Sequence, residues 1–303
     1  MKPKRFVIKD KKKKIALVYR IHSKEAVDMA AKVTHWLLKK NISVFTAPEQ
    51  KKIARTSMIV SSNELKEMNL IVVLGGDGTY LRAVRLLRNH SVPIIGFNMG
   101  SLGFLTTHSQ DEVFDMLTMT LKNQMMLNPL TLIRATVKSK SKSKSKKVTS
   151  FDALNDFVIE RGSFSQLIST TVYHNKLLVN DIKADGVIIS SPTGSTAYNL
   201  AAGGPILHPS VKALIVTPVA PHSLTSRPLI LDCENEITLR LNEQTSTAHF
   251  IVDGQKVFEL SPEDEVTIKV CNHYHYAVRK PDHSFFSLLK EKLKFGDRYV
   301  TGA

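Results

Sequence analysis

Cysteine is scarce in this sequence: Cys233 and Cys271 are the only two among 303 residues. Two cysteines so far apart provide neither a disulfide framework nor a CxxC pair for zinc. The two histidines that stand out, His208 and His222, have no partner at the spacing of a metal site. We therefore predict no metal-ligating residue, and the cysteine content favours a reducing cytoplasm.

Long apolar runs are also missing. The longest candidates, near residues 70–74 and 187–189, have the length of strands, whereas a membrane helix needs roughly 20 apolar residues. The first residues are charged and lack the apolar stretch and cleavage site of a secretory signal, and their lysine bias without serine argues against a transit peptide. The sequence predicts no transmembrane segment and no membrane partner.

The net charge of +15 is concentrated in two short runs. Residues 2–14 carry eight basic side chains and one acidic one, and residues 138–147 carry six lysines. Such repulsive runs bury nothing, so we expect a basic disordered tail at 1–14 and a solvated Lys/Ser loop at 138–147. Because no aromatic residues alternate with the lysines to stack on bases, nucleic acid is not expected as a partner. A weak contact with a polyanion is the alternative.

The hydrophobic pattern from residue 15 to 127 alternates short apolar runs with helical spacing. A strand pattern that alternates with helices favours a parallel sheet covered by helices, as in a Rossmann-like α/β domain. We assign residues 15–127 to this domain. The predicted strands are 15–19, 42–45, 70–74 and 93–97, and the predicted helices are 27–38 and 80–87.

The pattern changes between residues 128 and 283, where short strands are separated by turn residues and helical spacing is rare. This pattern predicts a mostly antiparallel, β-sandwich-like domain with the Lys/Ser loop as a hairpin tip. Apolar residues at helical spacing then predict a closing helix at about 284–295 that packs on the first domain. The predicted strands are 130–137, 156–160, 167–173, 186–189, 214–217, 236–241, 247–252 and 265–270.

The strongest chemical signal is the segment 70–79, in which an apolar strand runs directly into the motif GGDGT and then into a helix. Gly75, Gly76 and Gly78 have no side chains, so backbone N–H groups can approach a phosphate beside the carboxylate of Asp77. Neither the P-loop pattern nor GxGxxG fits this segment. In the alternative interpretation, Asp77 caps the helix and the glycines only form a tight turn.

Longer motifs make the sequence resemble the NAD kinase family, of the bacterial ATP- or polyphosphate-dependent type. GGDGT at 75–79 is shared with diacylglycerol-type lipid kinases and, in related form, with phosphofructokinases. The segment 185–209, DGVIISSPTGSTAYNLAAGGPILHP, resembles the long signature of NAD kinases alone. Further similar pieces are found at 98–105, 153–157, 221–228 and 252–255.

The resemblance implies an enzyme that phosphorylates the 2′-hydroxyl of the adenosine ribose of NAD to give NADP. ATP or another phosphoryl donor and a divalent cation, Mg²⁺ above all, are implied as co-substrate and cofactor. Asp77 would act as the general base on the hydroxyl, which is typically worth roughly 10²–10⁴-fold. The residues implied to cradle the triphosphate are Gly75, Gly76, Gly78 and Thr79.

The resemblance also implies an NAD site. Asn155 and Asp156 would bind a ribose diol, although the family usually has Glu where this chain has the shorter Asp156. Asp253 would join this site, but Asp253-Gly254 is also an ideal hairpin turn that needs no ligand. The other implied contacts are Lys183 on a pyrophosphate or ribose, Asp185 at the nicotinamide end, and Thr196, Ala197 and Tyr198 around adenine and its ribose. Lys183 and Asp185 could equally be turn residues, and Tyr198 a partly buried core aromatic.

Two other functions remain open on sequence grounds. A lipid or other small-molecule kinase would share Asp77 but not the segment 185–209. A nucleic-acid or membrane-surface binder without catalysis would use the lysine runs. The family also forms homodimers and homotetramers, so the resemblance implies self-association.

Overall fold

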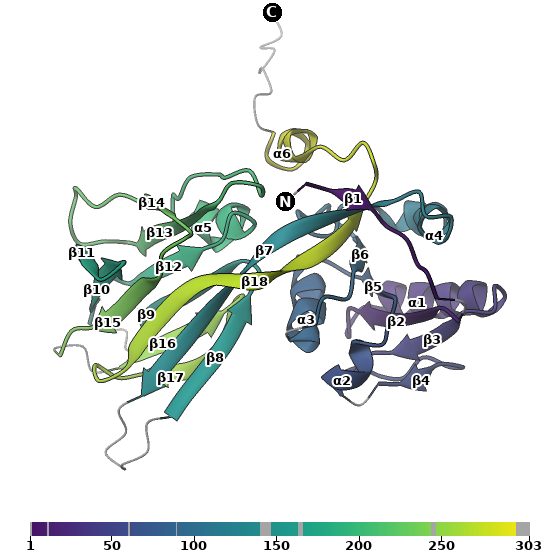
Figure 1. Cartoon of the computed structure of the whole chain (residues 1–303), viewed down its shortest axis with the longest axis horizontal. Helices are drawn as coiled ribbons and strands as arrows, with labels where there is room; N and C mark the ends of the chain where they lie inside the picture. The colour runs from purple at the N-terminus through teal and green to yellow at the C-terminus, as the bar shows by residue number, and fades with distance from the viewer. Residues whose placement is uncertain are drawn as a thin grey trace, which may run out of the picture. The chain divides into compact units, whose positions relative to one another are not determined.

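The computed structural model describes residues 2–10, 12–59, 61–88, 90–139, 147–162, 166–243 and 247–294. The chain forms two compact units, which Figure 1 shows with their helices and strands labelled. Residues 1–129 and 275–303 form the first, here called the α/β unit, and residues 130–274 form the second, the β unit. In the part of the chain that the structure describes, no helix is long and apolar enough to cross a membrane.

The α/β unit contains a parallel sheet, as the alternating pattern predicted. Its strands pair in the order β6, β5, β2, β3, β4, and the end of β18 pairs in parallel with β6. The five residues of β5 are all buried, because helices cover a parallel sheet on both faces and the strand is apolar throughout. The strands are β2 (Lys14–Tyr19), β3 (Ser43–Thr46), β4 (Ser57–Met58), β5 (Leu70–Leu74), β6 (Ile94–Phe97) and β18 (Glu265–Arg279).

Amphipathic helices accompany this sheet. The first begins at Ser23, whose side chain caps it by accepting a hydrogen bond from the backbone N–H of Ala26 at 3.2 Å. It buries Ala26, Ala30, Val33 and Leu37, which lie on one helix face. The helical segments of the unit are α1 (Lys24–Leu38), α2 (Ser62–Leu65), α3 (Asp77–Leu87), η1 (Gln110–Glu112), α4 (Val113–Leu121) and α6 (Phe285–Leu293).

The β unit is antiparallel, also as predicted. One sheet has the strand order β14, β13, β12, β9, β16, β17, and a second runs β11, β10, β15, β18, β7, β8. Apolar side chains from both sheets, such as Phe250 on β16 and Ile133 on β7, share one core. The strands are β7 (Met126–Ser139), β8 (Lys147–Ala153), β9 (Asp156–Arg161), β10 (Ile168–His174), β11 (Leu177–Ala184), β12 (Gly186–Ser190), β13 (Ala213–Val219), β14 (Leu229–Asp232), β15 (Ile237–Leu241), β16 (Ala248–Val252) and β17 (Gln255–Leu260).

The basic N-terminal segment differs from the disordered tail that its charge predicted. Strand β1 (Lys4–Arg5) pairs with the start of β7, and Phe6 and Ile8 are only 4% and 8% exposed. The physical reason is the alternation of apolar residues with lysines, which lets one face of the segment bury while the charged side chains stay in water.

The Lys/Ser run has its two ends on the hairpin of β7 and β8, in which Ser139 is paired with Lys147. Lys138 lies 3.6 Å from a carboxylate oxygen of Glu265. The expected solvated loop between these strands, residues 140–146, lies outside the described residues.

Candidate functional site

The glycine turn after β5 has the shape that its sequence suggests. A Cβ on Gly75 would overlap the hydroxyl and Cβ of Thr79, so only glycine lets Thr79 pack over the turn. A Cβ on Gly76 or Gly78 would meet nothing within 4 Å, so open space lies beside both residues. Gly76 is the N-cap residue of α3, and Asp77 is the first residue of that helix. The turn therefore offers a helix N-terminus and free backbone to an anion.

Asp77 holds the loop 103–106 through its carboxylate. Its Oδ1 accepts hydrogen bonds from the backbone N–H of Leu105 at 3.1 Å and from the N–H and hydroxyl of Thr106, both at 3.0 Å. Among the described residues, Oδ2 accepts only the N–H of Phe104, at 2.8 Å. A Cβ on Gly103 would overlap Oδ1, so glycine is needed there. Because each carboxylate oxygen has two lone pairs, Oδ2 keeps one acceptor position open.

Arg279 binds the same loop and was not predicted from the sequence. Only 5% exposed, its guanidinium donates to the carbonyl of Phe104 at 3.1 Å and to the hydroxyl of Thr107. Burial lowers the pKa of Arg279, and the negative charge of Asp77 opposes this shift. Asp77 and Arg279 thus hold the loop from its N–H and C=O groups respectively. No local spacing could have revealed Arg279, because the contact spans more than 170 residues.

Asp253 plays a similar part in the β unit. Its carboxylate accepts the backbone N–H groups of Leu154, Asn155 and Asp156 at 3.0, 2.8 and 3.2 Å. Asp253 and Gly254 also form the turn between β16 and β17, with φ values of 47° and 76°. The residue therefore belongs to a hairpin turn and also fixes the backbone of 154–156.

Asn155 and Asp156 are nearly buried, with side chains that keep hydrogen-bonding capacity. They are 9% and 3% exposed, and neither side-chain amide nor carboxylate makes a hydrogen bond among the described residues. Burial raises the pKa of Asp156 to about 7, and the charge of Asp253 adds to the rise. A nearly buried amide and carboxyl that have spare valences suit a ligand with paired hydroxyl groups.

The segment 191–199 packs against this backbone. Ser191 donates its N–H to the carbonyl of Asn155 at 2.8 Å, and a Cβ on Gly194 would overlap that same carbonyl. The segment contains η2 (Gly194–Thr196) and the start of α5 (Tyr198–Ala201). Thr196 and Ala197 are half-buried.

Asn199 holds this segment and was not singled out from the sequence. It is fully buried, its amide nitrogen donates to the carbonyls of Ser195 and Pro205, both at 3.1 Å, and its oxygen accepts the hydroxyl of Thr217 at 2.6 Å.

A cavity of about 450 Å³ in the β unit brings two predicted residues together, Asp185 and Tyr198. Tyr198 is 42% exposed, so it is not a core aromatic. Asp185 forms an ion pair with Arg161 at 3.1 Å. Lys183 is exposed on β11 outside the cavity lining. The residues that line the cavity are Glu160, Arg161, Gly162, Asp185, Tyr198, Val219 and His249.

Comparison with protein families gives two matches. The family model of the ATP-NAD kinase N-terminal domain matches residues 15–125, and that of the ATP-NAD kinase C-terminal domain matches residues 154–280. The NAD kinase of Bdellovibrio bacteriovorus is 53% identical over 284 residues, which are 94% of this chain and 92% of that protein. The NAD kinase of Geobacter metallireducens is 35% identical over 94% of this chain and its own full length.

Two solved structures share the fold. A crystal structure of yeast NADH kinase complexed with NADH has a TM-score of 0.88 at 24% identity and covers 97% of this chain and 91% of its own. An NAD kinase from Archaeoglobus fulgidus in complex with ATP has a TM-score of 0.69 at 22% identity and covers 93% and 96%. At these identities the two structures support the arrangement of strands and helices alone.

Proposed function

The chain belongs to the ATP-NAD kinase family, and from this premise we propose how its own residues transfer a phosphoryl group to the 2′-hydroxyl of NAD, giving NADP. The alternative of a lipid or other small-molecule kinase is not favoured, because both matching domain models are those of NAD kinases. The observation that carries the residue assignment is the open acceptor position on Asp77 beside a glycine turn with free space.

Asp77 is the general base in this proposal. An alcohol is a poor nucleophile until a base takes its proton. The Oδ2 atom of Asp77 can accept a hydroxyl without giving up its bond to Phe104, while Oδ1 keeps the loop 103–106 in place. The backbone bonds fix the direction of the carboxylate, so its orientation costs no reorganisation when the substrate binds.

The turn 75–79 holds the phosphoryl donor. Gly76 and Gly78 leave room for phosphate oxygens, Thr79 adds a hydroxyl, and the N-terminus of α3 favours their negative charge. Magnesium would supply neutralisation of the charge on the transferring group. The turn suits this ion, since magnesium sites of this kind use one or two carboxylates together with substrate phosphates.

The β unit binds NAD in this proposal. Asn155 and Asp156 offer a ribose diol their unused valences, with Asp156 as acceptor in its ionised form. Tyr198 offers an exposed ring for stacking, beside Thr196 and Ala197. Asp253 acts as a positioning residue for Asn155 and Asp156 rather than as a contact of its own.

Asp185 and Lys183 are the remaining proposed NAD contacts. Asp185 lines the cavity together with Tyr198 and forms an ion pair with Arg161. This position suits a contact with the nicotinamide end of NAD. Lys183 lies two residues earlier on β11, exposed and able to reach a phosphate or ribose.

We further propose self-association and a cytoplasmic location. Large apolar side chains are exposed on the β unit, among them Leu177, Leu178 and Leu224 at 72%, 61% and 92%, and such side chains are commonly covered in oligomers. Both cysteines are free thiols, in keeping with a reducing compartment.

The proposal is tested by incubating the purified chain with NAD, a phosphoryl donor and magnesium. NADP and ADP should appear in equal amounts with ATP, and replacing ATP by polyphosphate reports the donor range. Phosphorylation of diacylglycerol in place of NAD would contradict the proposal and indicate a lipid kinase.

A further inference from the structure

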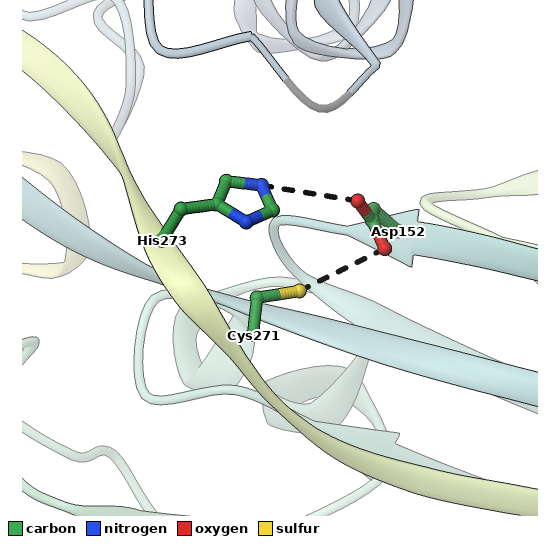
Figure 2. A group of neighbouring side chains, drawn as sticks. All are labelled: Asp152, Cys271 and His273. Atoms are coloured by element: carbon green, nitrogen blue, oxygen red, sulfur yellow. Dashed lines mark hydrogen bonds and ion pairs between the residues drawn. The ribbon is translucent and has the colours of Figure 1, made fainter.

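Three side chains on the second sheet of the β unit form a group that includes none of the residues assigned above. Asp152 comes from β8, and Cys271 and His273 come from β18, where a spacing of two residues puts both on one face. Figure 2 shows the three side chains pointing toward one another. Their potential ligand atoms all lie within 4.8 Å of one another. We call this the Asp-Cys-His group.

The group is incompletely satisfied by protein contacts. The Nε2 atom of His273 is buried and has no hydrogen-bond partner among the described residues, and it lies 3.9 Å from Oδ2 of Asp152. The thiol of Cys271 lies 3.7 Å from Oδ1 of Asp152, which is at best a weak hydrogen bond. A buried polar atom without a partner costs about 1–3 kcal/mol, so a native structure that retains one calls for an explanation.

A metal ion satisfies all three atoms at once. Zinc binds sulfur at about 2.3 Å and nitrogen or oxygen at about 2.0–2.2 Å, so tetrahedral ligand atoms lie about 3.3–3.6 Å apart. The thiol and the Nε2 atom lie 3.7 and 3.9 Å from different oxygens of Asp152, and the three ligand atoms lie within 4.8 Å of one another. The side chains would therefore close by up to about 1 Å around an ion. We propose that Asp152, Cys271 and His273 bind a zinc-like divalent ion, with water as the fourth ligand.

The ligand chemistry separates this ion from the magnesium of the reaction. Magnesium requires oxygen ligands and octahedral geometry, whereas a thiolate and an imidazole select zinc and its neighbours. The ion would link β8 and β18, the two strands that flank β7. Its role is therefore to fix the second sheet of the β unit.

Arg134 on β7 both supports and competes with the ion. Its Nε and Nη2 atoms lie 2.5 and 2.7 Å from the two carboxylate oxygens of Asp152. This pair orients the carboxylate, as partners of metal ligands commonly do. Its positive charge also opposes a cation, so we expect a site of moderate affinity.

Binding also requires the thiol to lose its proton. Burial raises the pKa of Cys271 to about 12, and the carboxylate of Asp152 adds to the rise. The free thiol is therefore protonated at neutral pH, and coordination of the thiolate should release about one proton for each ion bound.

The test uses the full-length chain and Co²⁺ as a spectroscopic probe, followed by displacement with Zn²⁺. One Co²⁺ per chain should bind with a sulfur-to-cobalt charge-transfer band, and Zn²⁺ should abolish that band. Cys271→Ser should lose the band, and Cys271→Ser and His273→Ala should each weaken binding by about tenfold or more. Cys233→Ser, at the other free thiol, is the matched control and should keep both.

The proposal is overturned if no thiolate band appears, if Cys271→Ser binds Co²⁺ as tightly as the unchanged chain, or if the band disappears in Cys233→Ser instead. Asp152→Asn provides a second ligand variant should one of the others fail to fold. Thermal unfolding gives an independent readout, because Zn²⁺ should raise the Tm of the unchanged chain and of Cys233→Ser but not that of Cys271→Ser.

Discussion

Replacing Asp77 by asparagine separates two roles that the structure gives to one carboxylate. In the better of its two orientations, the amide oxygen of the new side chain would keep the bonds to Leu105 and Thr106, and its NH₂ group would face the N–H of Phe104, now a donor opposite a donor. A hydrogen bond to a charged group contributes about 1.5–3 kcal/mol. The variant should therefore lose about this much stability, which corresponds to a Tm lower by about 3–10 °C.

The catalytic loss should be larger than this local loss explains. If Asp77 takes the proton of the attacking hydroxyl, Asp77→Asn lowers kcat by roughly 10²–10⁴-fold. The KM for NAD should change little, because Asn155 and Asp156 keep their side chains. The assay is NADP formation with magnesium and ATP, combined with thermal unfolding of the same preparations.

Gly103→Ala is the matched control for the loop. A Cβ there would overlap Oδ1 of Asp77 and displace the loop 103–106 while it leaves the carboxylate in the chain. If the loop alone mattered, the two variants would lose kcat in proportion to their loss of Tm. Retention of kcat within tenfold in Asp77→Asn, despite a lowered Tm, would refute the assignment of Asp77 as base.

Three further predictions concern other parts of the chain. In the folded chain the pKa of Asp156 is raised from 3.8 to about 7, so the protonated side chain contributes its full stability below pH 4, and this contribution is lost as the pH rises to 7. Across this range, the free energy of unfolding of Asp156→Asn in urea should gain up to about 4 kcal/mol relative to the unchanged chain. Only the unchanged chain should bind NAD more tightly as the pH rises through 7. Asp253→Ala leaves three backbone N–H groups without their acceptor. In steady-state kinetics it should raise the KM for NAD by about tenfold or more and leave the KM for ATP unchanged. The control Glu263→Gln, at an exposed residue, should change neither KM. Deleting residues 2–8 should destabilise the chain by about 3–6 kcal/mol, since Phe6 and Ile8 are buried; an unchanged midpoint of urea unfolding would contradict their place in the core.

The strands that could be predicted are those whose apolar pattern is set by burial. The strand at 70–74 is apolar throughout and was predicted with its exact bounds, and the pattern at 156–160 gave β9 to within one residue. The strands β11 and β14 were missed. Most of their side chains are exposed. Both strands lie at sheet edges and pair with only one neighbour, so their sequences show no regular alternation of apolar and polar residues.

The candidate site was predictable where a motif is contiguous and not where it depends on distant residues. The turn 75–79 could be read from its glycines, but the bonds from Asp77 to the loop 103–106 depend on how separate strands align. The same holds for Arg279 and for the pairing of Asp152 with Cys271, which are 119 positions apart. No local spacing encodes these contacts, so they can be identified only in the folded structure.

The most direct measurement is the formation of NADP from NAD, ATP and magnesium by the purified chain, with the position of the new phosphate determined by ³¹P and ¹H nuclear magnetic resonance. We expect one ADP for each NADP and a phosphate on the 2′-oxygen of the adenosine ribose. A folded chain that forms no NADP with ATP or any other donor, or that phosphorylates another position, would contradict the proposed function.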